Sequence, residues 1–103
     1  MLFRSGGGFG SAWKQICKKA PVVIGENMKE RVIPVAKDIG GHVYKPRGEW
    51  TSAKQARWAK DMKRQVDRGE RDLIDIGRDP DRLEQLVPPC EAYSIERQIF
   101  YGE

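Results

Sequence analysis

Three carboxylates in this sequence are well placed for acid–base or metal chemistry. Glu26 follows the β-branched run Val22-Val23-Ile24 and Gly25, Asp75 closes a second apolar run, and Asp79 comes shortly after it. A carboxylate near the end of an apolar strand is costly unless it is paired or used. Together the three can bind a hard cation such as Mg²⁺, or one of them can act as a general base. The structural alternatives are an arginine ion pair for Asp75 and a simple turn at Asp79.

Gly25 and Asn27 form a candidate anion-binding loop. A glycine between a strand and a helix start leaves backbone N–H groups exposed, and these can hold an anion. The segment lacks the further glycines of a dinucleotide fingerprint and the lysine of a phosphate-binding loop. Glu26 lies between them and repels a phosphate unless it serves as a base or a metal ligand. The alternative is a tight turn at Gly25 and a helix cap at Asn27.

Positive charges alternate with aromatic rings in the middle of the chain, a mixture that nucleic-acid surfaces use for phosphate contact and base stacking. The residues expected to bind nucleic acid are Lys45, Trp50, Lys54, Arg64 and Arg68. The last three recur with Arg57 near one face of a helix expected at 52–68. We expect Arg57 to stabilise charge on a scissile phosphate. The alternatives are a solvated surface and, for the tryptophan, a core or interface position.

Glu96 is a charged residue among apolar ones in the segment 91–101, which we expect to be the last helix. It joins Glu26, Asp75 and Arg57 as a candidate catalytic residue, and the alternative is a solvated helix position. His42 is the only histidine, which argues against an RNase that uses a histidine pair. Two cysteines are too few for a disulfide scaffold, and they form no zinc pattern.

The elements that must position these residues alternate between strands and helices. We expect strands at 21–24, 42–45 and 72–76, with helices at 27–39, 52–68 and 91–101. This order predicts an α/β fold with a small three-stranded, mostly parallel sheet and flanking helices, with an α+β fold as the alternative. Ligands of such sheets bind beyond the carboxyl ends of the strands. The rule brings together three loops, 25–27, 45–50 and 75–79.

Length and charge limit the organisation of the chain. The 103 residues are enough for one domain, which we place at 21–103, after a flexible glycine-rich lead-in and short helix at 1–20. Residues 1–69 carry a net charge of +9 and residues 70–103 a net charge of −5. This asymmetry indicates either two surfaces with different partners or ordinary solubilising charge. No apolar run approaches the roughly 20 residues of a membrane span.

Several of these segments occur in a characteristic order. They are Val23–Met28 with Arg31-Val32, Ala36 and Gly40-Gly41 before Tyr44, then Arg57-Trp58, Asp75–Pro80 and Ala92–Arg97. In this order they resemble the C-terminal toxin modules of bacterial polymorphic toxins, which end proteins of the Rhs-repeat, haemagglutinin-type and contact-dependent inhibition kinds. The resemblance covers roughly residues 22–101 and is poorest from Arg82 to Cys90.

The resemblance implies an antibacterial effector that is secreted or delivered as part of a larger protein and acts in the target-cell cytoplasm. It also implies a cognate immunity protein, which we expect to be acidic because the helix at 52–68 is basic. Many such modules are nucleases, and the basic stripe favours this class, with RNA preferred over DNA and either a metal-independent or a Mg²⁺-assisted reaction. The alternatives are an NAD- or nucleotide-directed enzyme and a non-enzymatic basic module that binds nucleic acid or protein.

Overall fold

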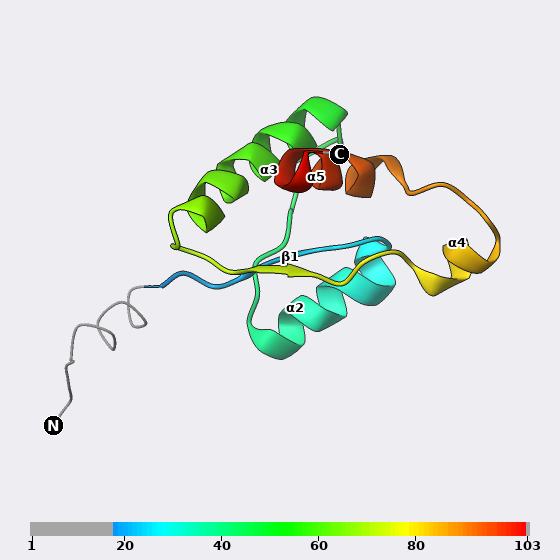
Figure 1. The fold of residues 1–103 in the computed structure, drawn as a ribbon, viewed down its shortest axis with the longest axis horizontal. Coiled ribbons are helices and arrows are strands. Elements are labelled where there is room, and N and C mark those ends of the chain that lie inside the picture. Colours follow the sequence, from blue (N-terminus) through cyan, green and yellow to red (C-terminus); the bar gives the residue numbers. More distant parts are fainter. Residues whose placement is uncertain (1–17, 103) are drawn as a thin grey trace, which may run out of the picture.

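The computed structural model describes residues 18–102, in which two short parallel strands lie between layers of helices (Figure 1). The elements in chain order are β1 (Val22–Ile24), the π-helix η1 (Met28–Val32), α2 (Ile33–Ile39), α3 (Ser52–Asp67), β2 (Leu73–Asp75), α4 (Pro80–Glu84) and α5 (Glu91–Tyr101). Helices α3 and α5 pack together on one face of the strands, and α2 lies on the other (Figure 1). Of the glycine-rich lead-in and short helix expected at 1–20, residues 1–17 lie outside the described part of the chain.

The alternation of side chains along the strands divides the core into two parts. On one face, Val22 and Ile24 of β1 pack with residues of α3 and α5, namely Ala59, Met62 and Phe100. On the other face, the buried partners of Val23 come from η1, α2 and the segment after α2, namely Val32, Ala36 and Val43. All three residues of β1 have no exposed surface, which explains why this run is entirely β-branched.

The strand expected at 42–45 does not form, so the prediction of a three-stranded sheet is wrong. Only His42 pairs with β1: its N–H donates to the carbonyl of Pro21 at 2.7 Å, and its carbonyl accepts from the N–H of Val23 at 2.9 Å. This is an isolated parallel bridge. Within residues 18–102 the sheet has two strands, β1 and β2, paired in parallel register from Val22 with Leu73 to Ile24 with Asp75.

The residues after His42 pack on both sides of the sheet. Val43 is buried in the core part that faces α2, whereas the ring of Tyr44 packs against Trp58 of α3, with 5.3 Å between the ring centroids. Beyond His42, none of the residues 43–45 forms a further bridge to β1. The result is a small α/β fold with a two-stranded parallel sheet.

The helices follow the sequence signals closely, with one addition. The helix expected at 27–39 is divided into η1 and α2, and Pro34 stands in the first turn of α2, where its missing N–H is harmless. Helix α4 was not expected: Asp79 caps it with a side chain that accepts from the N–H of Asp81, and Pro80 is its first residue. None of the described helices is long and apolar enough to cross a membrane.

Candidate active site

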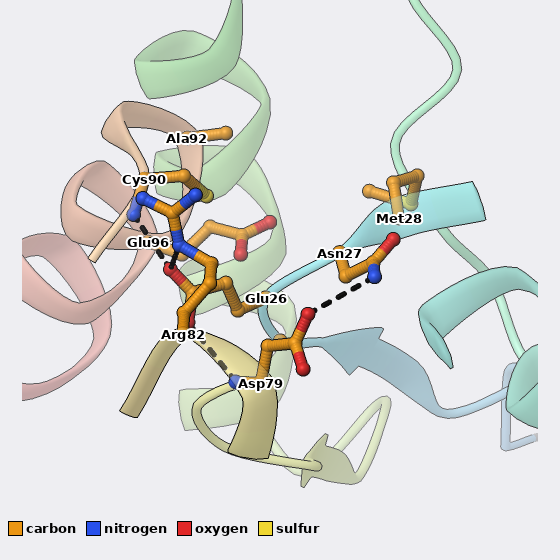
Figure 2. A pocket seen from close by; sticks show the side chains of 9 residues that line it. Glu26, Asn27, Met28, Asp79, Arg82, Cys90, Ala92 and Glu96 are labelled. Atoms are coloured by element: carbon orange, nitrogen blue, oxygen red, sulfur yellow. Dashed lines mark hydrogen bonds and ion pairs between the residues drawn. The ribbon is translucent and has the colours of Figure 1, made fainter. Parts of the chain in front are cut away.

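A pocket of about 350 Å³ opens where β1 ends, close to the starts of α4 and α5 (Figure 2). Its lining residues are Gly25, Glu26, Asn27, Met28, Asp79, Arg82, Cys90, Ala92 and Glu96. The pocket brings the expected anion-binding residues together with two of the candidate catalytic carboxylates. Its position agrees with the rule that α/β sheets bind ligands beyond the carboxyl ends of their strands.

Glu26 is fully buried, and four groups surround its carboxylate. Arg78 Nε donates to Oε1 at 2.9 Å, and Arg82 Nε lies 2.8 Å from Oε2 in an ion pair that is not aligned as a hydrogen bond. The backbone N–H of Asp79 donates to Oε1 at 3.0 Å and that of Cys90 donates to Oε2 at 2.8 Å. One carboxylate thus joins the starts of α4 and α5 to the loop after β1.

The surroundings keep Glu26 ionised. Burial alone raises the pKa of this carboxyl, but the hydrogen bonds from Arg78, Asp79 and Cys90 and the charge of Arg78 outweigh burial and lower the pKa to about 2. A general base must exchange a proton near the working pH, and a metal ligand needs free oxygen lone pairs. The contacts of Glu26 therefore fit an anchor of the two loops better than either expected role.

Further hydrogen bonds fix the loops at the ends of the strands. The N–H of Glu26 donates to the carbonyl of Gly77 at 3.1 Å, and Arg31 donates to the carbonyls of these same two residues at 3.2 and 3.3 Å. Asn27 caps η1 from a left-handed conformation with φ of 70°, and its Nδ2 donates to Oδ2 of Asp79 at 3.0 Å (Figure 2). Asn27 therefore acts as a helix cap, which was the alternative to its expected role in binding an anion.

Gly25 is required by close packing. A Cβ at this position would collide with Cγ1 of Ile76, which follows β2. Its backbone N–H forms a hydrogen bond to the carboxyl of Glu96. The exposed N–H that the sequence suggested for an anion is therefore directed at a carboxyl group of the chain itself.

Glu96 projects from α5 into the pocket with 1% of its surface exposed. Gln55 Nε2 donates to its Oε2 at 3.0 Å. Burial raises the pKa of Glu96, and the negative charge of Asp75 adds to this, whereas the hydrogen bonds from Gly25 and Gln55 oppose it; the result is a pKa of about 8. At neutral pH this carboxyl holds its proton and can still exchange it.

Asp75 does not line the pocket. Its Oδ1 accepts from the hydroxyl of Tyr93 at 2.9 Å and from the N–H of Gly77 at 2.8 Å, and its Oδ2 accepts from the hydroxyl of Tyr101 at 2.7 Å. Burial, and then the hydrogen bond to Asp75, raise the pKa of Tyr93. The sequence analysis offered an arginine ion pair as the alternative to a catalytic role for Asp75, but its side-chain partners are two tyrosines. Asp75 influences the pocket through its negative charge, which raises the pKa of Glu96.

Arg57 lies on a different surface. It is exposed on α3 and lines a second hollow of about 470 Å³, the α3 groove, whose residues are Lys54, Arg57, Trp58, Lys60, Asp61 and Arg64. Successive helix residues are about 100° apart, so Arg57 lies about 200° around the axis from Gln55, the α3 residue that contacts Glu96. Arg57 is therefore not directed at the pocket, and the arginine that lines the pocket is Arg82.

The residues expected to bind nucleic acid lie on α3 and on the loop before it. Lys54 Nζ donates to two backbone carbonyls of that loop at 2.9 and 3.2 Å, so it is partly used in structure. Arg64 and Arg68 each lie near a carboxylate, at 2.8 and 3.6 Å. Lys45 is exposed, and Trp50, 36% exposed, donates its indole N–H to Gln55.

Metal binding by the expected carboxylates is not favoured by their geometry. The oxygens of Glu26 face two arginines, those of Asp75 face two tyrosines, and Asp79 is bound to Asn27 and caps α4. Among residues 18–102, no three side chains of His, Cys, Asp or Glu gather closely enough to hold a metal ion.

Sequence reasoning missed four residues of this site: Gln55, Arg78, Arg82 and Cys90. The two arginines lie in or beside α4, which the pair Asp79-Pro80 signals as a cap followed by a first-turn proline. Cys90, a free and half-buried thiol, precedes α5. Gln55 carried no signal, because a single buried glutamine within a helix looks like a surface residue until its partner is known.

Comparison with protein-family models, with curated proteins and with solved structures gave no match to this chain. The function is therefore inferred from the pocket itself. The pocket combines a buried carboxyl that holds an exchangeable proton with a wall that contains Glu26, Asp79 and Arg82, and Arg78 pairs with Glu26 from beside it, so these four charges sum to zero. This arrangement can deliver a proton to a group bound beside Glu96, with the guanidinium of Arg82 in the same wall.

Proposed function

We propose that this chain is an antibacterial effector domain that cleaves RNA, with Glu96 as the residue that transfers a proton. The observation that carries the proposal is a carboxyl that is 1% exposed, lines a pocket at the strand ends and has a pKa of about 8. Catalytic acids and bases work best when their pKa lies near the operating pH, and strongly shifted groups in clefts are typical of active sites.

The proposed reaction uses the 2′-hydroxyl of RNA. The 2′-oxygen attacks the adjacent phosphorus, its proton passes to water, and the bond from phosphorus to the 5′-oxygen breaks as Glu96 donates its proton to that oxygen. Glu96 then regains a proton from water. Arg82 offers positive charge to the phosphate from the pocket wall. The products are a 2′,3′-cyclic phosphate and a 5′-hydroxyl, and DNA is not a substrate for this route because it lacks the 2′-hydroxyl.

The remaining parts of the proposal rest on charge and on the resemblance to polymorphic-toxin modules. The α3 groove carries four cations and one carboxylate around Trp58, a composition suited to a phosphate backbone. The same groove suits an acidic immunity protein, because complementary charge accelerates association. Delivery as part of a larger protein and action in the target-cell cytoplasm follow from the resemblance.

A second candidate function is favoured by the separation of the two hollows. The pocket at Glu96 is about 350 Å³, within the range that small-molecule sites occupy, and the α3 groove is on another side of α3. A nucleotide such as NAD would occupy the pocket without using the basic helix. This chain would then be a nucleotide-directed toxin with the same Glu96 as its proton-transfer residue.

The test compares substrates and two matched variants. Purified chain is incubated with bacterial RNA, genomic DNA and NAD, and the products are analysed for cyclic phosphate and for free nicotinamide. Glu96→Gln keeps the shape of the protonated side chain and removes the exchangeable proton, and Glu91→Gln is its control on the exposed first turn of the same helix. We expect RNA cleavage and toxicity on cytoplasmic expression in bacteria, both lost in Glu96→Gln only. Full activity of a folded Glu96→Gln variant refutes the proposal, and nicotinamide release without RNA cleavage establishes the second candidate.

A further inference from the structure

A line of hydrogen bonds runs from the protein surface to Glu96. The indole Nε1 of Trp50 donates to Oε1 of Gln55 at 2.9 Å, and Nε2 of Gln55 donates to Oε2 of Glu96 at 3.0 Å. Gln55 is 1% exposed and Glu96 is equally buried, whereas Trp50 is 36% exposed. The three residues come from the loop before α3, the first turn of α3 and the middle of α5.

The indole fixes which end of the Gln55 amide meets the carboxyl. An indole N–H can only donate, so Gln55 must turn its carbonyl oxygen to Trp50 and its NH₂ group to Glu96. An amide donor stabilises the ionised carboxylate, whereas the amide oxygen can only accept a proton from the neutral acid. The orientation of one buried amide therefore decides which protonation state of Glu96 it favours.

We infer that Trp50 and Gln55 are positioning residues that hold a hydrogen-bond donor against Glu96 and so set the proton affinity of this carboxyl. The hydrogen-bond line itself is a property of the fold, and its catalytic consequence rests on the proposed function. Gln55 keeps the buried acid from binding its proton too tightly to release it. Trp50 prevents the amide from turning over.

The other groups around Glu96 stay in place when this line is broken. The backbone N–H of Gly25 donates from the loop after β1, and the charge of Asp75 acts from β2. Charged neighbours in the pocket are Arg82 and Asp79 of the α4 region and Glu26, which is neutralised by its two arginines. A change at Gln55 or Trp50 therefore alters one donor and leaves the remaining electrostatic environment of Glu96 intact.

The experiment is a titration of the Glu96 carboxyl by ¹³C NMR in the full chain and in three variants. Gln55→Leu removes the donor, and Trp50→Phe removes the indole N–H and frees the amide to turn. Trp58→Phe is the matched control, because the indole Nε1 of Trp58 donates to His42 at 3.3 Å and not to Gln55. We expect the proton affinity of Glu96 to rise about 10-fold or more in Gln55→Leu and by a smaller factor in Trp50→Phe. The proton affinity of Glu96 should be unchanged in Trp58→Phe.

The outcomes separate this inference from the proposed function. An unchanged proton affinity in folded Trp50→Phe overturns the inference, and so does an equal rise in Trp58→Phe. Trp50→Phe tests the inference even if Gln55→Leu fails to fold, because it changes no atom of the buried residues Gln55 and Glu96. The expected rise in a chain that cleaves no RNA supports the hydrogen-bond line and rejects the function. If the chain cleaves RNA, its rate should depend on pH through the titration of Glu96. That part of the pH–rate profile must move to higher pH in Gln55→Leu and in Trp50→Phe.

Discussion

Replacing Glu96 by glutamine should change how stability depends on pH. Glu96 has a pKa of about 8 in the folded chain against an ordinary value of 4.5. Between these values the native state binds one proton more at this site than the unfolded state, so the free energy of unfolding falls as the pH rises. Glutamine does not titrate, so this part of the dependence should disappear in Glu96→Gln.

The size of the effect follows from the two pKa values. Each pH unit in this window lowers the free energy of unfolding by about 1.4 kcal/mol at most. From about pH 5 to about pH 7, the titration of Glu96 alone should lower the free energy of unfolding by roughly 2–3 kcal/mol. This is a large share of the roughly 5–15 kcal/mol that stabilises a typical domain. Above about pH 8 the loss should level off, because both states are then deprotonated.

Urea denaturation of the parent chain, Glu96→Gln and Glu91→Gln over this pH range measures the effect. His42 acts in the opposite direction: burial, with the charges of Arg71 and Lys45, lowers its pKa, so its contribution to stability grows as the pH rises through its titration. Subtracting the variant from the parent chain cancels this contribution. Glu91→Gln should retain the parent dependence. Parallel curves for the parent chain and Glu96→Gln would refute a protonated, buried Glu96.

Three further predictions test the surroundings of the pocket. Glu26→Gln should destabilise the chain by about 3–5 kcal/mol in thermal or urea unfolding, because it leaves two arginines without their counter-charge; a loss below about 1 kcal/mol would contradict the anchoring role. Asp75→Asn should lower the pKa of Glu96 by removing a negative charge, and NMR titration would detect this; an unchanged pKa would show that the charge of Asp75 does not reach the pocket. Arg57→Glu with Lys60→Glu should weaken binding of single-stranded RNA to the inactive Glu96→Gln chain and reduce the slope of log K against log salt by about 1.4. An unchanged slope would mean that the α3 groove does not contact the phosphate backbone.

The sequence was most informative where one local signal decides the structure. The β-branched run at β1, the helix α3 and the terminal helix α5 all lie close to where patterning placed them. The strand expected at 42–45 is reduced to one bridge between His42 and Val22, because its pairing with β1 depends on the tertiary fold, which no local pattern encodes.

The same distinction applies to the pocket. Sequence reasoning identified Glu26 and Glu96 as unusual carboxylates but gave them similar roles. The structure separates them by their neighbours, since Arg78 and two backbone N–H groups keep Glu26 ionised and burial keeps Glu96 protonated. Arg78 lies 52 residues from Glu26, and Gln55 lies 41 residues from Glu96. Partners at such separations are fixed only by the tertiary fold.

The carboxylate of Glu26 also has a consequence for how the chain acquires its structure during synthesis. Its partners Arg78, Asp79 and Cys90 follow it by 52, 53 and 64 residues. At about 5–20 residues per second, a ribosome adds the last of them roughly 3–13 seconds after Glu26. Until then the carboxylate remains in water and its hollow does not exist. Contacts between such distant segments also slow folding relative to local helix pairing. The pocket beside Glu26 can therefore form only after the segment that contains Cys90 has been synthesised.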